Sequence, residues 1–156
     1  MLWRNMGGVS MIFGRKKRVI NRLLIVEDEP LIAFDNEMFL EGAGYDVVAT
    51  VNSAEDAIEV LSNRADQIDA IVLDYNLAGP ASGIAVAQVA KDKGIKVLFV
   101  TGECPENVDG TAVGCLTKPY TQKHLLAALD VVEQIAEGKT PKTVPETLTL
   151  FTSHQA

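Results

Sequence analysis

Short apolar runs alternate with amphipathic segments along the chain from residue 23 onward. Five runs are rich in β-branched and aliphatic residues and are flanked by polar or turn residues, which is typical of strands. They cover residues 23–27, 45–51, 70–74, 96–101 and 114–118. Four of the five show no clean polar alternation, so we expect both faces of their sheet to be covered.

Helical periodicity fills the intervals between these runs. Residues 30–42 form one such segment, whose apolar face holds Leu31, Phe34, Met38 and Phe39. Ser53 has the character of an N-cap for a second helix, which continues to about residue 62. Two more helices are expected over residues 83–93 and 121–137.

A strand–helix repeat with such short connections predicts right-handed crossovers, and hence a parallel sheet covered by helices on both faces. The expected fold class is therefore a doubly wound α/β domain with five strands. Only sixteen residues separate Thr101 from Lys118, and they include Pro105 and Gly110. The fourth helix of the repeat should therefore be short or replaced by a loop.

Polar side chains stand at the carboxyl ends of these strands, where doubly wound domains bind ligands. They are Glu27, Asp28, Glu29, Asp74, Thr101 and Lys118. Carboxylates gathered at one edge repel each other and raise one another's pKa unless a cation lies between them. Oxygen ligands without His or Cys favour Mg²⁺, so the pattern predicts a magnesium site.

The same residues have the chemistry of phosphoryl transfer to an aspartyl side chain. Asp74 would be the nucleophile, Lys118 can neutralise an incoming phosphoryl group, and Thr101 can hydrogen-bond one of its oxygens. Each residue alone also has an ordinary explanation, as a helix cap or a surface side chain. Their conjunction at the ends of four strands, in order, favours the functional interpretation.

Composition is that of an ordinary globular domain. The chain has 156 residues, 47% hydrophobic and 22% charged, with a net charge of −7, which argues against a general nucleic-acid binder. Six of its 14 Lys and Arg residues lie within residues 1–22, where no acid occurs. We expect residues 1–22 to be a basic, flexible leader, with docking on an anionic membrane or an acidic partner as the alternative.

No run has the length of a membrane span or the form of a signal peptide. The two cysteines, Cys104 and Cys115, do not make the disulfide framework of a secreted protein, so a reducing, cytoplasmic compartment is expected. Residues 138–156 should hold no separate domain such as a helix-turn-helix. Within them, residues 147–151 could add to the sheet as an edge strand, although a frayed tail is preferred.

Together these motifs resemble the receiver domain of bacterial two-component response regulators of the chemotaxis type, from Leu23 to about Ala136. The resemblance implies a flavodoxin-like sheet with strand order 2-1-3-4-5 and a receiver domain over residues 23–137. It also implies that Asp74 accepts a phosphoryl group from a sensor histidine kinase, a histidine phosphotransfer protein or a small phosphodonor.

The resemblance assigns roles to the surrounding residues as well. The Mg²⁺ ligands would be Asp28, Asp74 and the main-chain carbonyl of Asn76, with Glu27 acting through metal-bound water. Thr101 and Lys118 would hold the phosphoryl oxygens. A cis peptide bond before Pro119 would orient Lys118 into the site.

The chain departs from the common receiver pattern in three ways. The acid pair is Glu-Asp rather than Asp-Asp, the fourth helix is short, and Cys115 occupies a position that is usually aromatic, so no ring flip there can couple the site to the far face. With the stretch LFVTGE, these features resemble the alphaproteobacterial single-domain subgroup that carries a Phe-Ala-Thr-Gly motif. Asn76 and Glu103 could position an attacking water, which predicts a short-lived phosphoaspartate.

The expected function is a stand-alone signalling receiver, not an enzyme, that acts through protein contacts or as a phosphate sink, for instance in a stress or light pathway. We expect a monomer or weak dimer, without nucleic acid as a partner. Two alternatives stay open: a degenerate receiver that binds partners independently of phosphorylation, and a hydrolase of the haloacid dehalogenase type. Asn76 disfavours the second, because that family carries an Asp two residues after its nucleophile.

Overall fold

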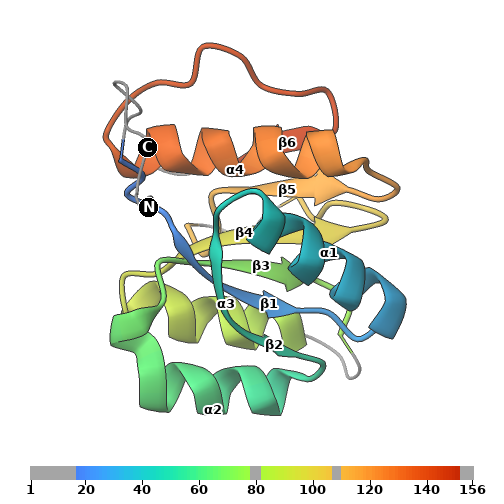
Figure 1. The fold of residues 1–156 in the computed structure, drawn as a ribbon, viewed down its shortest axis with the longest axis vertical. Helices are drawn as coiled ribbons and strands as arrows, with labels where there is room; N and C mark the ends of the chain where they lie inside the picture. The colour runs from blue at the N-terminus through green and yellow to red at the C-terminus, as the bar shows by residue number, and fades with distance from the viewer. Residues whose placement is uncertain (1–16, 78–81, 107–109, 152–156) are drawn as a thin grey trace, which may run out of the picture.

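A six-stranded sheet forms the centre of the molecule (Figure 1). The structure is a computed structural model, and it describes residues 17–77, 82–106 and 110–151. The strands are β1 (Arg22–Val26), β2 (Asp46–Val51), β3 (Ala70–Asp74), β4 (Lys96–Thr101), β5 (Gly114–Thr117) and β6 (Leu148–Leu150). Their order is β2-β1-β3-β4-β5-β6, in which the first five are parallel and β6 is antiparallel to β5. The doubly wound α/β fold with order 2-1-3-4-5 is confirmed.

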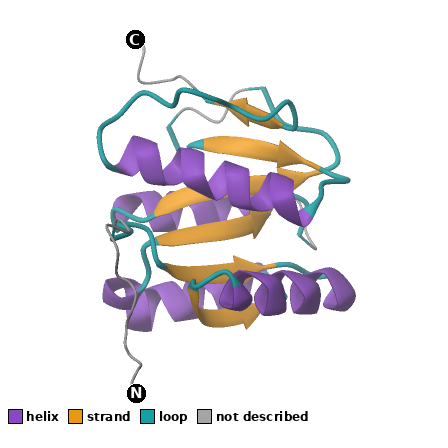
Figure 2. Ribbon diagram, turned by 45° about the horizontal axis from the view of Figure 1, so that its top comes forward, coloured by secondary structure: helices purple, strands orange, loops and turns teal. Residues whose placement is uncertain are grey.

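Helices cover both faces of this sheet, as Figures 1 and 2 show. They are α1 (Pro30–Gly42), α2 (Ala54–Arg64) with the 3-10 turn η1 (Ala65–Gln67), α3 (Ser82–Asp92) and α4 (Gln122–Ala136). The helices α1 and α4 pack on one face, and α2 and α3 pack on the other. Successive strand residues alternate between these two cores, because side chains of a strand point to opposite faces. Leu24 and Ile71, for example, face α2 and α3, whereas Leu23 and Val72 face α1 and α4.

The connection between β4 and β5 contains no helix among the residues that the structure describes there, 102–106 and 110–113. This confirms the prediction that the fourth helix of the repeat is short or replaced by a loop. None of the described helices is both long and apolar enough to span a bilayer.

Residues Leu148–Leu150 form the strand β6, although a frayed tail was expected there. Its residues pair with β5 in the register Gly114–Leu150, Cys115–Thr149 and Leu116–Leu148, and Leu148 is buried. The preference for a frayed tail is therefore wrong over residues 148–150. The sheet has six strands, because the edge of β5 offers unpaired backbone groups that this segment satisfies.

The end of the expected leader also packs on the domain. The backbone N–H groups of Val19 and Ile20 donate to the carboxylate of Glu133 in α4, at 2.9 and 2.7 Å. The guanidinium of Arg18 lies 3.9 Å from the ring centroid of Tyr45. The ordered domain therefore begins before residue 23. The rest of the expected leader, residues 1–16, lies outside the described residues.

Helix α1 buries a different stripe from the one that its apolar residues mark. Its buried residues are Ala33, Asn36 and Leu40. Leu31, Phe34 and Met38 are 79%, 60% and 56% exposed. These three side chains are called the α1 stripe below. Periodicity reveals an apolar face on a helix, but it does not say what covers that face.

The two cysteines are bonded to each other, a pairing that was not predicted from the sequence. The Cα atoms of Cys104 and Cys115 lie 5.9 Å apart. Cys115 is buried in the core between the sheet and the α2–α3 layer, and Cys104 packs against the same core from the turn after β4. That turn carries the chain back over β5, where the Sγ of Cys104 also lies 3.4 Å from the Oγ1 of Thr117.

Candidate functional site

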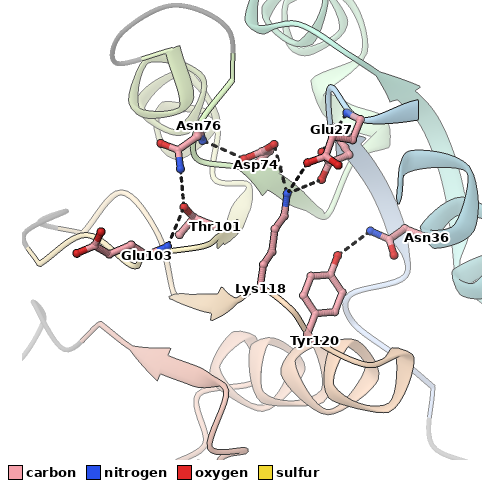
Figure 3. Close-up of polar contacts among 9 residues, drawn as sticks. Glu27, Asn36, Asp74, Asn76, Thr101, Glu103, Lys118 and Tyr120 are labelled. Atoms are coloured by element: carbon pink, nitrogen blue, oxygen red, sulfur yellow. Dashed lines mark hydrogen bonds and ion pairs between the residues drawn. The ribbon is translucent and has the colours of Figure 1, made fainter. Parts of the chain in front are cut away.

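The carboxyl ends of β1, β3, β4 and β5 bring the predicted polar side chains together (Figure 3). Parallel strands that begin at one edge of a sheet end at the other, so residues far apart in sequence meet there. Asp74 and Thr101 are the last residues of β3 and β4. Glu27 and Lys118 follow directly after β1 and β5.

Three carboxylates form the centre of the site. One oxygen atom from each of Glu27, Asp28 and Asp74 lies within 4.8 Å of the other two. Glu27 and Asp74 are only 3% and 4% exposed, whereas Asp28 is exposed to solvent. Two buried acids and one exposed acid offer the hard oxygen donors that Mg²⁺ prefers, on a side that solvent reaches. The residues present therefore fit a divalent cation.

Lys118 is the cation that the chain itself supplies to this cluster. Its Nζ lies 3.4 Å from Oε1 of Glu27, 3.6 Å from Oδ2 of Asp74 and 3.9 Å from Oε2 of Glu29. Burial alone would lower the pKa of Lys118, but the charges of Glu27 and Asp74 hold that pKa above its ordinary value. The lysine is therefore charged when it faces the carboxylates.

The environment of the cluster favours the protonated form of Glu27. Burial, together with the negative charge of Asp74, raises the pKa of Glu27 to about 7, although the N–H of Glu29 and the charge of Lys118 act in the opposite direction. The N–H of Glu29 donates to Oε2 of Glu27 at 3.1 Å, which fixes the orientation of this carboxylate. A cation bound at the cluster would favour the ionised form.

Asn76 links the carboxylate of Asp74 to Thr101. Its backbone N–H donates to Oδ1 of Asp74 at 2.9 Å, and its side-chain Nδ2 donates to Oγ1 of Thr101 at 2.7 Å. The N–H of Glu103 also points to Oγ1 of Thr101, at 3.4 Å. In Figure 3 the carboxylate of Glu103 points away from Asp74. Thr101 is 1% exposed, so these contacts fix its hydroxyl at the edge of the site.

The backbone around Lys118 is tied to the end of β4. The N–H of Lys118 donates to the carbonyl of Thr101 at 2.8 Å. The peptide bond between Lys118 and Pro119 is cis. The residue after this proline, Tyr120, points toward α1 in Figure 3.

A contact between Asn36 and Tyr120 was not predicted. Nδ2 of Asn36 donates to the hydroxyl of Tyr120 at 2.9 Å and joins α1 to the segment that carries Lys118. Asn36 is 6% exposed. A buried amide needs a hydrogen-bond partner, but the apolar face predicted for this helix does not include Asn36 and Tyr120 lies 84 positions away, so no sequence signal pointed to the contact.

A cavity of about 460 Å³ lies beside this contact. It is lined by Ile32, Asp35, Asn36, Lys118, Pro119, Tyr120 and Gln122. The cavity therefore adjoins the Lys118 side of the carboxylate cluster, and the α1 stripe lies on the same helix.

Comparison with known proteins agrees with this geometry. The family model described as a response regulator receiver domain matches residues 23–130. The phyllosphere-induced regulator PhyR of Methylorubrum extorquens is 36% identical over 93 residues, which are 54% of this chain and 34% of that protein. The chain spans between 34% and 50% of the length of the first three curated relatives.

Solved structures show the same similarity. The response regulator PhyR from Brucella abortus superposes with a TM-score of 0.64 at 29% identity, over 78% of this chain and 51% of that one. A response regulator receiver protein from Sinorhizobium medicae gives a TM-score of 0.62 at 30% identity, over 72% of this chain and 93% of that one. This chain therefore belongs to the family of response regulator receiver domains.

Proposed function

We propose that this receiver accepts a phosphoryl group on Asp74 in a Mg²⁺-dependent reaction. The donor is the phosphohistidine of a sensor histidine kinase or of a histidine phosphotransfer protein, or a small phosphodonor. A carboxylate oxygen of Asp74 forms the new O–P bond as the bond between phosphorus and the donor breaks. The observation that carries the proposal is the position of Asp74, which ends a buried strand beside two other carboxylates and an ammonium group.

The neighbouring side chains have the chemistry that this transfer needs. Lys118, 3.6 Å from Asp74, would neutralise negative charge on the phosphoryl oxygens. The hydroxyl of Thr101 accepts from Asn76 and keeps its own hydrogen free to donate to a phosphoryl oxygen.

Four groups would hold the metal ion. They are Glu27 through a water molecule, Asp28, Asp74 and the main-chain carbonyl of Asn76. Bound Mg²⁺ would offset the carboxylate charge and polarise the phosphoryl oxygens. The chain does not act as an enzyme on other substrates in this proposal, because the group that it modifies is its own.

The α1 stripe supports a protein as the physiological donor. Leu31, Phe34 and Met38 expose apolar surface on the helix that flanks the site, and clustered exposed apolar side chains mark interaction surfaces. A kinase or phosphotransfer protein that covers this stripe could bring a phosphohistidine to Asp74. We place this exchange in the cytoplasm, where sensor kinases present their phosphohistidines.

The output is proposed to be a protein contact or the removal of phosphate from a kinase, in a stress pathway. A PhyR relative of known structure from Bartonella quintana, 27% identical, is described as an anti-anti-sigma factor, which supports an output through protein binding. The net charge of −7 disfavours nucleic acid as a partner. We also propose that Asn76 and Glu103 shorten the lifetime of the phosphoaspartate, and that the protein is a monomer or weak dimer.

Labelling by acetyl phosphate tests the proposal. The parent protein should acquire one phosphoryl group in Mg²⁺ and none in excess chelator, and Asp74→Asn should acquire none. Asp92→Asn is the matched control, because it removes an exposed carboxylate from the end of α3. Binding of a partner protein by Asp74→Asn, combined with no labelling of the parent, would instead support a phosphorylation-independent binding module.

A further inference from the structure

The disulfide joins the turn after β4, which leaves the proposed phosphorylation site, to strand β5. We propose that Cys104 and Cys115 are a reversible redox modification site, which exchanges with a low-molecular-weight disulfide such as oxidised glutathione. We further propose that its state sets how fast Asp74 acquires a phosphoryl group. The second statement rests on the proposed function, whereas the exchange does not.

The two sulfur atoms can pair without help from another cysteine. The chain contains only these two, eleven positions apart, and their Cα atoms are 5.9 Å apart. That separation lies within the range that a disulfide bridges without movement of the backbone. Oxidation therefore leads to one defined intramolecular product.

Solvent reaches Cys104 but not Cys115. Cys104 is half-buried in the turn, whereas Cys115 is fully buried beneath it in the core. A reagent in solution meets Cys104 first, and Cys115 can react only with a sulfur already held at Cys104. This arrangement gives one attacking and one resolving cysteine.

The exchange balances in two steps. The thiolate of Cys104 attacks oxidised glutathione, forms a mixed disulfide and releases one glutathione thiolate. The thiolate of Cys115 then attacks the sulfur of Cys104, and the second glutathione leaves. The two protein thiols lose two electrons and two protons, and one oxidised glutathione becomes two reduced molecules. Excess reduced glutathione reverses both steps.

The bond ties the edge of the site to β5. Cys104 lies three residues after Thr101, and its Sγ lies 3.4 Å from the hydroxyl of Thr117, which directly precedes Lys118. Between them, the N–H of Glu103 contacts the hydroxyl of Thr101. Backbone hydrogen bonds already join the ends of β4 and β5, so opening the disulfide frees the turn without separating the strands.

This placement predicts the direction of the effect. The hydroxyl of Thr101 must turn toward a phosphoryl group on Asp74, and the N–H of Glu103 in the bonded turn contacts this hydroxyl at 3.4 Å. Opening the disulfide frees that contact to rearrange. The reduced protein should therefore take up the phosphoryl group faster than the oxidised protein. In a cytoplasm rich in thiols, disulfides are typically transient and redox-sensing, so the bond would mark oxidative conditions.

The test uses the full chain in buffers with different ratios of reduced to oxidised glutathione. Alkylation followed by mass spectrometry counts the free thiols, and acetyl phosphate in Mg²⁺ measures the labelling rate of each state. We expect two thiols in reducing buffer and none in oxidising buffer. Labelling should be about fivefold faster in the reduced state, which corresponds to the lower end of the coupling found between two sites. Cys104→Ser should label at the same rate in both buffers.

Three results would overturn the inference: thiols that stay free at every ratio, a bond that persists at every ratio, or equal labelling rates of the two states. Absence of labelling in both states would refute the proposed function and the coupling together. In that case the thiol count would still show whether Cys104 and Cys115 exchange with glutathione. Equal labelling of both states would refute the coupling alone and leave the proposed function intact.

Discussion

The Nζ of Lys118 lies 3.6 Å from Oδ2 of Asp74. The two residues come from the ends of strands that are separated by β4, and their contact depends on the parallel order of the sheet. The same ammonium lies 3.4 Å from Glu27. One lysine therefore offsets the charge of two buried carboxylates.

Replacement of Lys118 by Gln should slow labelling by acetyl phosphate by about a hundredfold, because one charged donor at the developing charge is removed. Lys123→Gln, which removes an exposed lysine near the start of α4, serves as the control and should label at the parent rate. Equal rates for Lys118→Gln and the parent would show that Lys118 has no part in the transfer.

Removal of the metal should destabilise the parent and leave Asp28→Asn almost unaffected. We expect Asp28→Asn to weaken Mg²⁺ binding by more than about tenfold, a loss seen even for groups that only support a ligand. Without metal, the variant should be at least as stable as the parent, because one of three mutually repelling carboxylates is gone.

Thermal unfolding with Mg²⁺ and with chelator measures both effects. The melting temperature of the parent and of Asp92→Asn should rise with Mg²⁺, because a ligand that binds only the folded state stabilises it. An equal rise for Asp28→Asn would place the metal elsewhere.

Asp69 directly precedes β3, at the end of the sheet opposite the carboxylate cluster. Its carboxylate should make the free energy of unfolding depend on pH. Its carboxylate accepts from the N–H groups of Asn21 and Arg22, at 3.0 and 2.8 Å, and forms an ion pair with Arg22 at 2.9 Å. Burial alone would raise the pKa of Asp69, but the hydrogen bonds and charge of Arg22, with the N–H of Asn21, hold that pKa below its ordinary value.

Because the folded protein binds this proton less tightly than the unfolded chain, the stabilisation is complete above the unfolded pKa and is lost as pH falls through the folded pKa. The difference in the free energy of unfolding between the parent and Asp69→Asn should therefore be largest near neutral pH and shrink in acid. Urea unfolding between about pH 3 and pH 7 measures it. A difference that grows in acid would contradict the assignment of a lowered pKa to Asp69. The control is Asp92→Asn, which removes an exposed carboxylate.

Gly114→Ala should loosen β6. A Cβ at position 114 would lie 2.6 Å from the backbone oxygen of Thr149, too close for β6 to stay in place. We expect a loss of about 1–3 kcal/mol in the free energy of unfolding and faster amide exchange over β6. Gly42→Ala meets no atom within 4 Å, so it should be neutral or stabilising by up to about 1 kcal/mol. Equal exchange in both variants would show that β6 does not depend on Gly114.

The sequence pattern was sufficient to predict the five parallel strands and the meeting of Asp74 and Lys118, whereas the strand order came from the family resemblance. Buried parallel strands leave a strong pattern, and their polar ends must share one edge. The pairing of Cys104 and Cys115 was missed because it depends on how one turn folds back over β5. No local pattern encodes that path.

The edge strand and the surface of α1 were harder for a different reason. Residues 148–150 are too few to distinguish a strand from a tail, since only the free edge of β5 decides the matter. The sequence placed the α1 stripe and Phe39 on one apolar helical face, but periodicity does not report which of these residues another element covers. Asn36 was overlooked because its partner, Tyr120, comes from a distant segment.

The most direct test locates the phosphoryl group after labelling with acetyl phosphate in Mg²⁺. The acyl phosphate is reduced with borohydride, and peptide mass spectrometry then identifies the modified residue. The account predicts one modified residue, Asp74, and none when Mg²⁺ is chelated. A stable phosphoryl group on another residue, or equal modification of Asp74 without the metal, would contradict it.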